Sequence, residues 1–155
     1  MRTKNTLSIS KANGSRLKIG IVVSRWHDEI TSSLLIGCKK ALIKSGVKEK
    51  NIIVVSVPGS FELPFAAKHL IQTKTVSAVV CMGCLVKGQT SHYKYICQAV
   101  TSGIMQLNLQ SSVPVIFGVL TCKTISQARV RSRGKNNHGY AWGISAVKMG
   151  TLKKK

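Results

Sequence analysis

Four short apolar runs rich in β-branched residues constrain the fold more than any other feature of this sequence. They cover residues 17–24, 51–57, 77–83 and 113–119. Stretches with apolar residues at helical spacing separate them or follow the last one, at residues 29–46, 62–73, 92–109, 124–131 and 139–152. Strands that are apolar almost throughout and alternate with helices are typical of a parallel sheet covered on both faces. The sequence therefore predicts a three-layer α/β/α fold with a four-stranded parallel sheet.

The length of the chain favours a single domain, and we expect neither a membrane span nor a secretory signal. A chain of 155 residues can bury a full core. We find no internal repeat or linker, so we expect one domain over residues 1–155. No apolar run reaches the roughly 20 residues that a membrane-spanning helix needs. The basic start lacks the apolar core of a secretory signal, so we expect a cytoplasmic protein with no membrane contact.

The cysteines indicate buried thiols. Their number is odd and they lie in apolar stretches, at Cys38, Cys81, Cys84, Cys97 and Cys122. Cys81 and Cys84 match the pattern C-x-x-C, but side chains three residues apart in a strand point to opposite faces. No second Cys/His pair with zinc spacing follows, so we expect structural thiols and no metal site.

Ligands of parallel sheets usually bind beyond the carboxyl ends of the strands, where residues 83–92 form a candidate anion site. They resemble a P-loop, but Gln89 stands where a lysine would follow Gly88, which disfavours an NTPase. A glycine loop that leads into a helix still offers free N–H groups and the positive end of the helix dipole. With Gln89, Thr90 and Ser91 adding side chains, we expect a single phosphate to bind here.

His92 opens the helix beside this loop. Histidine titrates near neutral pH and can therefore move protons in imine formation and elimination. We interpret His92 as catalytic. His27, His69 and His138 have no comparable neighbours, and we interpret them as bystanders.

Residues at two further strand ends each allow two interpretations. Glu62 follows Pro58-Gly-Ser-Phe at a helix start, where a carboxylate either caps the helix or accepts hydroxyl groups of a ligand. In the second reading, backbone groups of Ser60 and Phe61 hold the edge of a heterocycle. Trp26 is either a surface residue or a platform on which a flat ring stacks.

Together these segments resemble the lumazine synthase family over about residues 17–149. The signatures are GIVVSR at residues 20–25, VPGSFELP at 57–64, GCLVKGQTSHYKY at 83–95 and VPVIFGVLT at 113–121. The resemblance implies a flavodoxin-like fold that assembles into homo-pentamers, and often into sixty-subunit icosahedral shells, with active sites between neighbouring subunits. Residues 1–16 would form an N-terminal arm that adds a strand to a neighbour's sheet.

The resemblance also implies a reaction and a role for each site residue. The enzymes of this family condense 5-amino-6-ribitylaminouracil with 3,4-dihydroxy-2-butanone 4-phosphate in riboflavin biosynthesis, without metal, flavin or nicotinamide. His92 would transfer protons. The pyrimidine and its ribityl chain would be bound by Trp26, Ser60, Phe61, Glu62 and, from the adjacent subunit, Phe117. The phosphate would be bound by Gly88, Gln89, Thr90, Lys135 and, from the adjacent subunit, Arg131.

The sequence departs from the family pattern in two places near the site. His27 stands where an asparagine usually follows the stacking aromatic residue, which here is Trp26 in place of the usual Phe. The loop over residues 132–139 is one residue shorter than usual, which leaves the role of Lys135 open.

The charge leaves two other functions open. The chain has 24 Lys and Arg against four Asp and Glu, a formal net charge of +20 that attracts nucleic acid and other polyanions. One alternative is a structural cage that binds nucleic acid, although such a cage would not need Glu62, His92 and Arg131. Another is a flavin-binding protein on the same fold, which leaves the phosphate loop unexplained.

Overall fold

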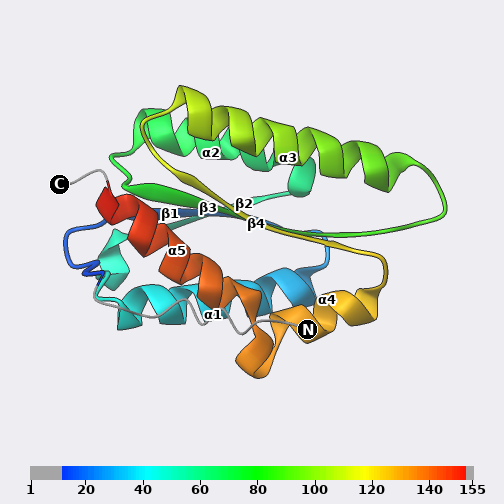
Figure 1. Ribbon diagram of the computed structural model, residues 1–155, viewed down its shortest axis with the longest axis horizontal. Coiled ribbons are helices and arrows are strands. Elements are labelled where there is room, and N and C mark those ends of the chain that lie inside the picture. Colours follow the sequence, from blue (N-terminus) through cyan, green and yellow to red (C-terminus); the bar gives the residue numbers. More distant parts are fainter. Residues whose placement is uncertain (1–11, 153–155) are drawn as a thin grey trace.

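A sheet of four parallel strands forms the centre of the protein, with helices on both faces (Figure 1). The computed structural model describes residues 12–152. The strands lie in the order β2-β1-β3-β4. Their bounds are β1 (Ile19–Ser24), β2 (Ile52–Val57), β3 (Ala78–Val86) and β4 (Val115–Cys122). The predicted three-layer α/β/α fold is confirmed.

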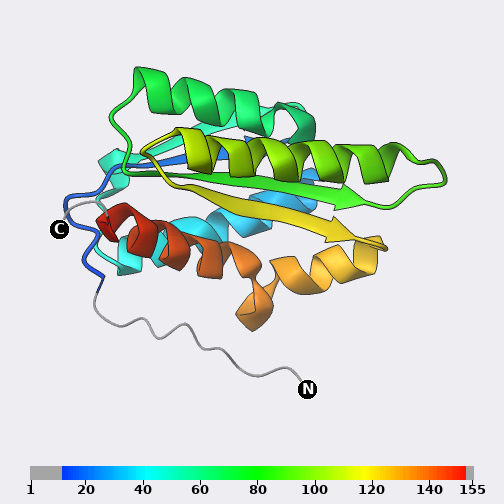
Figure 2. The ribbon, with the colours of Figure 1, turned by 45° about the horizontal axis from the view of Figure 1, so that its top comes forward.

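The two helix layers are unequal. Helices α2 (Leu63–Thr73) and α3 (His92–Gln110) cover one face of the sheet. The other face is covered by α1 (Asp28–Lys44), α4 (Ile125–Ser132) and α5 (His138–Leu152), as Figure 2 also shows. Short 3-10 turns are η1 (Glu49–Asn51), η2 (Ser60–Glu62) and η3 (Gly134–Asn136). None of the helices in the described range is long and apolar enough to cross a membrane. Of the expected N-terminal arm, residues 1–11 lie outside the described part of the chain.

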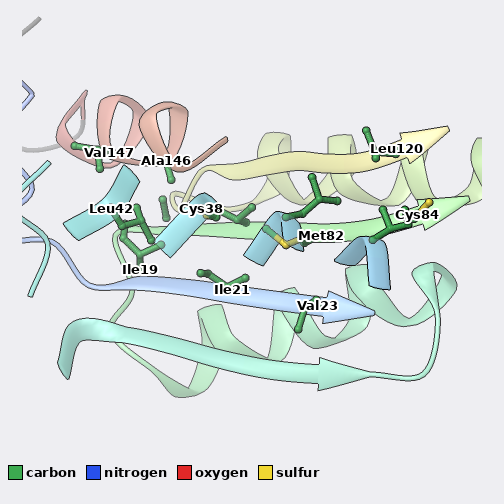
Figure 3. Packing of buried hydrophobic residues seen from close by; sticks show 14 of the residues in the cluster. Ile19, Ile21, Val23, Cys38, Leu42, Met82, Cys84, Leu120, Ala146 and Val147 are labelled. Atoms are coloured by element: carbon green, nitrogen blue, oxygen red, sulfur yellow. The ribbon is translucent and has the colours of Figure 1, made fainter. Parts of the chain in front are cut away.

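The sheet buries side chains on both faces because it lies between two helix layers. Ile19, Ile21 and Val23 point to the face of α1 and α5 (Figure 3). Val22 belongs to the core on the other face, under α2 and α3. The same alternation places Cys84 in the core on the side of α1 and α5, and Cys81 in the core on the side of α2 and α3. The prediction that the C-x-x-C cysteines face opposite sides is confirmed.

Two glycine-dependent features hold α1 in place. The predicted helix end at Gly46 is confirmed: its φ of 95° lies in the left-handed region that favours glycine. Val47 N–H donates to the Leu42 carbonyl and Gly46 N–H to the Ile43 carbonyl, each at 3.0 Å, which closes the last turn. At the contact between α1 and α5, Gly139 of α5 packs directly on the α1 backbone. A Cβ on Gly139 would overlap the carbonyl oxygen of Leu34.

The ends of β3 and β4 differ from the prediction. We expected β3 to end at residue 83 and β4 at residue 119, but the pair continues to Val86 and Cys122 in register. The prediction that Gly83 begins the anion-binding loop is therefore wrong, because Gly83 is a buried strand residue. The loop that joins β3 to α3 comprises residues 87–91 and projects past the sheet (Figure 1, right).

Candidate active site

A cavity of about 630 Å³ lies at the carboxyl ends of β1 and β3, a size typical of small-molecule sites. Its walls come from the turn after β1, from η2, from the end of β3 and from the start of α3. The expected site residues that line it are Trp26, Ser60, Phe61, Glu62, Gly88, Thr90 and His92. Segments more than 60 residues apart along the chain are therefore brought together as the sequence predicted.

The turn after β1 carries the exposed aromatic wall of the cavity. It continues the parallel ladder, since Arg25 N–H donates to the Val57 carbonyl at 2.9 Å and Trp26 N–H to the Pro58 carbonyl at 3.1 Å. The Trp26 side chain is 68% exposed. A large ring held on a fixed backbone and open to solvent can stack on a planar ligand.

His27, which we interpreted as a bystander, belongs to the same wall. It lines the cavity beside Trp26, with the two rings edge to face at 6.5 Å between centroids. Its backbone φ of 59° is left-handed, a conformation in which histidine and asparagine are several-fold enriched among non-glycine residues. His69 and His138 lie outside the cavity, as expected.

Glu62 shows both of the features that the sequence left open. Its Oε2 accepts the Gly59 N–H at 3.0 Å, which caps the turn that leads into α2. The same half-buried carboxylate lines the cavity. Ser60 lies at the cavity floor and is buried, while Phe61 is exposed at the rim.

The loop of residues 87–91 separates the cavity from a second, shallower recess of about 530 Å³. This recess is lined by residues of the loop, including Lys87 and Gln89, and by Lys94 and Lys123. Thr90 Oγ1 accepts the His92 N–H at 3.3 Å and so caps the start of α3. The positive end of a long helix and three lysines make this recess suited to an anion.

The sequence did not identify these lysines as site residues. Lys87 N–H donates to the Cys122 carbonyl at 2.9 Å, so the strand ends that carry Lys87 and Lys123 lie side by side. That Lys87 and Lys123 are neighbours follows only from the strand order, which places β3 beside β4. The available signal in the sequence was that Lys87 and Lys123 each directly follow an apolar stretch.

Two ionisable groups near the cavity, Cys84 and Tyr93, have raised pKa values and stay protonated near pH 7. Burial raises the pKa of the Cys84 thiol from 9.0 to about 12, so the thiol stays neutral and unreactive near pH 7. Burial, and then the neighbouring Cys97, raise the pKa of the Tyr93 phenol. Within residues 12–152, no group of three or more His, Cys, Asp or Glu side chains is arranged to hold a metal ion.

Three expected site residues lie away from the cavity of their own subunit. Phe117 of β4 is 39% exposed and lines a separate recess of about 500 Å³ on the other side of Tyr93. Arg131 of α4 donates to the Gln127 carbonyl at 3.0 Å and lies near Cys122, whose pKa it lowers against the effect of burial. Lys135 is exposed in η3.

Comparison with known proteins identifies the family. The sequence model described as 6,7-dimethyl-8-ribityllumazine synthase matches residues 16–154. A protein of that name from Bacteroides fragilis is 46% identical over 134 residues, which is 86% of this chain and 94% of the relative. Proteins of the same name from Parabacteroides distasonis and Porphyromonas gingivalis are each 47% identical, over 90% and 91% of this chain and 88% of each relative. The chain therefore belongs to the 6,7-dimethyl-8-ribityllumazine synthase family.

Proposed function

We propose that this protein condenses 5-amino-6-ribitylaminouracil with 3,4-dihydroxy-2-butanone 4-phosphate to 6,7-dimethyl-8-ribityllumazine in riboflavin biosynthesis. One observation carries the proposal beyond the family. A single cavity presents an aromatic ring and a carboxylate on one side, and a histidine beside a lysine-rich anion recess on the other. Two substrates, one planar and rich in hydroxyl groups and one phosphorylated, fit these two halves.

The pyrimidine half of the site consists of Trp26, Ser60, Phe61 and Glu62. Stacking on Trp26 fixes the plane of the ring, because the indole is exposed on a hydrogen-bonded turn. Glu62 accepts hydroxyl groups of the ribityl chain with the carboxylate oxygen that Gly59 leaves available. Backbone groups of Ser60 and Phe61 bind the ring edge.

The phosphate half consists of Gly88, Gln89 and Thr90 at the start of α3. Loop N–H groups and the helix dipole bind the dianion, and Lys87, Lys94 and Lys123 add positive charge. The same groups stabilise inorganic phosphate as it leaves. Placing this loop against the cavity holds the ketone carbon beside the 5-amino group, and such positioning supplies much of the rate.

His92 lies between the two halves and carries the proton transfers. It takes a proton as the 5-amino nitrogen adds to the ketone, and returns one as water leaves to form the imine. Tautomerisation of the imine lets phosphate leave and, after a further proton shift, leaves a ketone at the adjacent carbon. The ribitylamino nitrogen attacks this ketone, and loss of a second water closes the second ring. The protonated Tyr93 phenol next to His92 keeps negative charge out of this part of the cavity.

The site is completed in a homo-pentamer. Heterologous contacts between identical subunits close into rings, and each contact joins two different faces of the chain. Helices α2 and α3 present exposed apolar side chains, including Phe65, Met105 and Leu109, which a neighbour would cover. In this arrangement Phe117, Arg131 and Lys135 of one subunit reach the cavity of the next. Closure of twelve pentamers into a sixty-subunit shell is the larger assembly consistent with this proposal.

One edge of the sheet is open to pairing with a neighbouring subunit, and we expect the whole chain to be one domain. Strand β2 lies at the edge of the described sheet, so its backbone groups are available to a strand from a neighbour. We place the protein in the cytoplasm, in line with its five free thiols.

The direct test is to mix purified protein with both substrates and follow lumazine absorbance. We expect product, and a rate roughly 10²-fold lower for His92→Ala, as for the loss of a general acid–base group. Arg131→Ala should raise KM for the phosphate substrate and leave KM for the pyrimidine unchanged, because it removes a bidentate anion contact. No product from folded wild-type protein would reject the proposed function.

Mixing two impaired variants, assayed with the phosphate substrate far below the raised KM of Arg131→Ala, tests whether subunits share a site. Protein refolded from equal amounts of His92→Ala and Arg131→Ala chains should regain up to about a quarter of wild-type activity, because a quarter of the contacts pair two intact residues. Each variant refolded alone is the control. A mixture no more active than the average of its parents would place His92 and Arg131 in the site of one chain.

Polyanion binding is a second candidate function, favoured by a basic cluster on α4 and η3. Arg129, Arg133 and Lys135 are exposed there, and Glu29 forms ion pairs with both arginines. With a net charge of +20, the protein should retain nucleic acid on a filter with a steep dependence on salt. No retention at low salt would reject this function and leave the enzyme proposal intact.

A further inference from the structure

Two buried serine hydroxyl groups, one lining the cavity and one behind it, lie without a hydrogen-bond partner. Ser24, the last residue of β1, is 1% exposed, and Ser60, the first residue of η2, is 4% exposed. Among the buried side chains of residues 12–152, these two oxygens are the ones for which the protein supplies no partner. Since buried polar groups are nearly always paired, two such exceptions close to one another call for a physical reason.

The two oxygens converge on one point beside Gly83 of β3. A Cβ on Gly83 would overlap the Ser60 Oγ and lie 3.2 Å from the Ser24 Oγ. Ser24 points to the sheet face of α2 and α3, as Val22 does two residues before it. Ser60 lines the cavity, whereas Ser24 lies behind it. The absence of a side chain at Gly83 therefore leaves room for both hydroxyl groups beside the same point of β3.

The Ser24 hydroxyl does not stabilise the fold. A buried hydroxyl without a partner loses its hydrogen bonds to water and gains none in return. Alanine would fit the same space and remove that unfavourable term. A residue that lowers stability where a smaller one would fit is typical of a functional site.

We propose that Ser24 is a positioning residue for the ribitylaminopyrimidine, an inference that rests on the function proposed above. A serine hydroxyl has one proton to donate and two lone pairs that accept. When the ligand is bound, Ser24 donates to the Ser60 Oγ, so that the Ser60 proton points into the cavity toward a ligand oxygen. Ser24 thus sets the direction of the Ser60 hydrogen bond without touching the ligand.

The test compares Ser24→Ala and Ser24→Cys with wild type, because cysteine keeps the shape of serine, with a larger sulfur atom, and forms only weak hydrogen bonds. Both variants should melt at or above the wild-type temperature. Their KM for the aminopyrimidine should rise roughly 3- to 10-fold, the value of one hydrogen bond, while KM for the butanone phosphate stays unchanged. The matched control is Ser77→Ala at the opposite end of the sheet, where Ser77 Oγ accepts the Lys18 N–H at 3.1 Å. It should lower the melting temperature and leave both KM values unchanged.

Two outcomes would overturn the role of Ser24. One is an unchanged KM for the pyrimidine in folded Ser24→Ala. The other is a lower melting temperature with an equal rise of both KM values, which would make the hydroxyl structural. Calorimetric titration with 6-ribitylaminouracil, which lacks the reactive 5-amino group, separates this inference from the proposed function. If wild type makes no lumazine but binds this compound, the Ser24 comparison still decides; if wild type does not bind it, both proposals fail.

Discussion

The packing of α5 on α1 through Gly139 makes a quantitative prediction about stability. An alanine Cβ there would overlap the Leu34 carbonyl oxygen and lie 2.7 Å from the carbonyl carbon. Both obstacles are backbone atoms, so no side chain can turn aside to make room. The contact is fixed further by Asn137, which donates to the Ser33 carbonyl at 2.9 Å and accepts the Gly139 N–H at 2.9 Å. Gly139→Ala must therefore push the two helices apart.

We expect Gly139→Ala to destabilise the fold by about 3 kcal/mol, the upper end for overpacking in a rigid environment. For a chain of this size that lowers the melting temperature by roughly 6–12 °C. Two other glycines separate the causes. At Gly88 a Cβ meets nothing within 4 Å, so Gly88→Ala should change stability by less than about 0.5 kcal/mol. Gly134 is equally open but has a φ of +55°, and Gly134→Ala should be destabilising by about 1 kcal/mol.

The assay is thermal unfolding at one protein concentration, since the stability of an assembly depends on concentration. The expected order of melting temperatures is Gly88→Ala, then Gly134→Ala, then Gly139→Ala. A Gly139→Ala protein that melts with Gly88→Ala would refute the close backbone contact between α1 and α5.

Three further predictions concern pH and the aromatic wall of the cavity. Burial raises the pKa of Cys38 and Cys81 from 9.0 to about 12, so the folded state keeps protons that the unfolded chain releases. The free energy of unfolding should therefore fall as pH rises from 9 to 12, and denaturant titrations with a flat profile over this range would contradict it. Trp26→Ala should leave the melting temperature unchanged, because the side chain is exposed, and should raise KM for the pyrimidine; an unchanged KM would remove the ring from the site. His27→Asn should fold as wild type, whereas His27→Val should lose about 1–2 kcal/mol at the left-handed backbone, and equal melting temperatures would contradict that strain.

The sequence predicted the central strands β1 and β3 well because most of their residues are buried. Every residue of β1 is buried, so the strand reads as an unbroken apolar run. The ends of β3 and β4 could not be predicted in the same way, because Leu85 and Val86 are only half-buried and the two strands extend each other by pairing. Gly83 indicated a loop, but glycine occurs there because Ser60 packs against its α-carbon.

The same reasoning explains what was missed in the site. Residues next to a recognisable motif, such as His92 after the glycine loop, could be identified along the chain. The contribution of His27 depends on a left-handed backbone, and that of Lys123 on the pairing of β4 with β3. Neither feature leaves a periodic pattern in the sequence.

Glu62 is the residue at which stability and function can be separated most sharply. All four acids of the chain lie in the first turn of a helix or 3-10 turn, where a carboxylate is favourable whatever the protein does. The helix dipole accounts for Asp28 and Glu49, and Glu29 also pairs with Arg129 and Arg133, whereas Glu62 lines the cavity.

Glutamine at this position keeps the carbonyl oxygen that caps Gly59 N–H and loses only the charge. Glu62→Gln should thus melt within a few degrees of wild type, since the lost dipole interaction amounts to about 0.3–1 kcal/mol. A ribityl hydroxyl bonds a carboxylate more strongly than an amide, so KM for the pyrimidine should rise about tenfold. Glu62→Ala removes cap and acceptor together and should lose both stability and affinity. If the glutamine variant binds the pyrimidine as wild type does, Glu62 is a cap, and the cavity must hold the ribityl chain through Ser60 and the backbone alone.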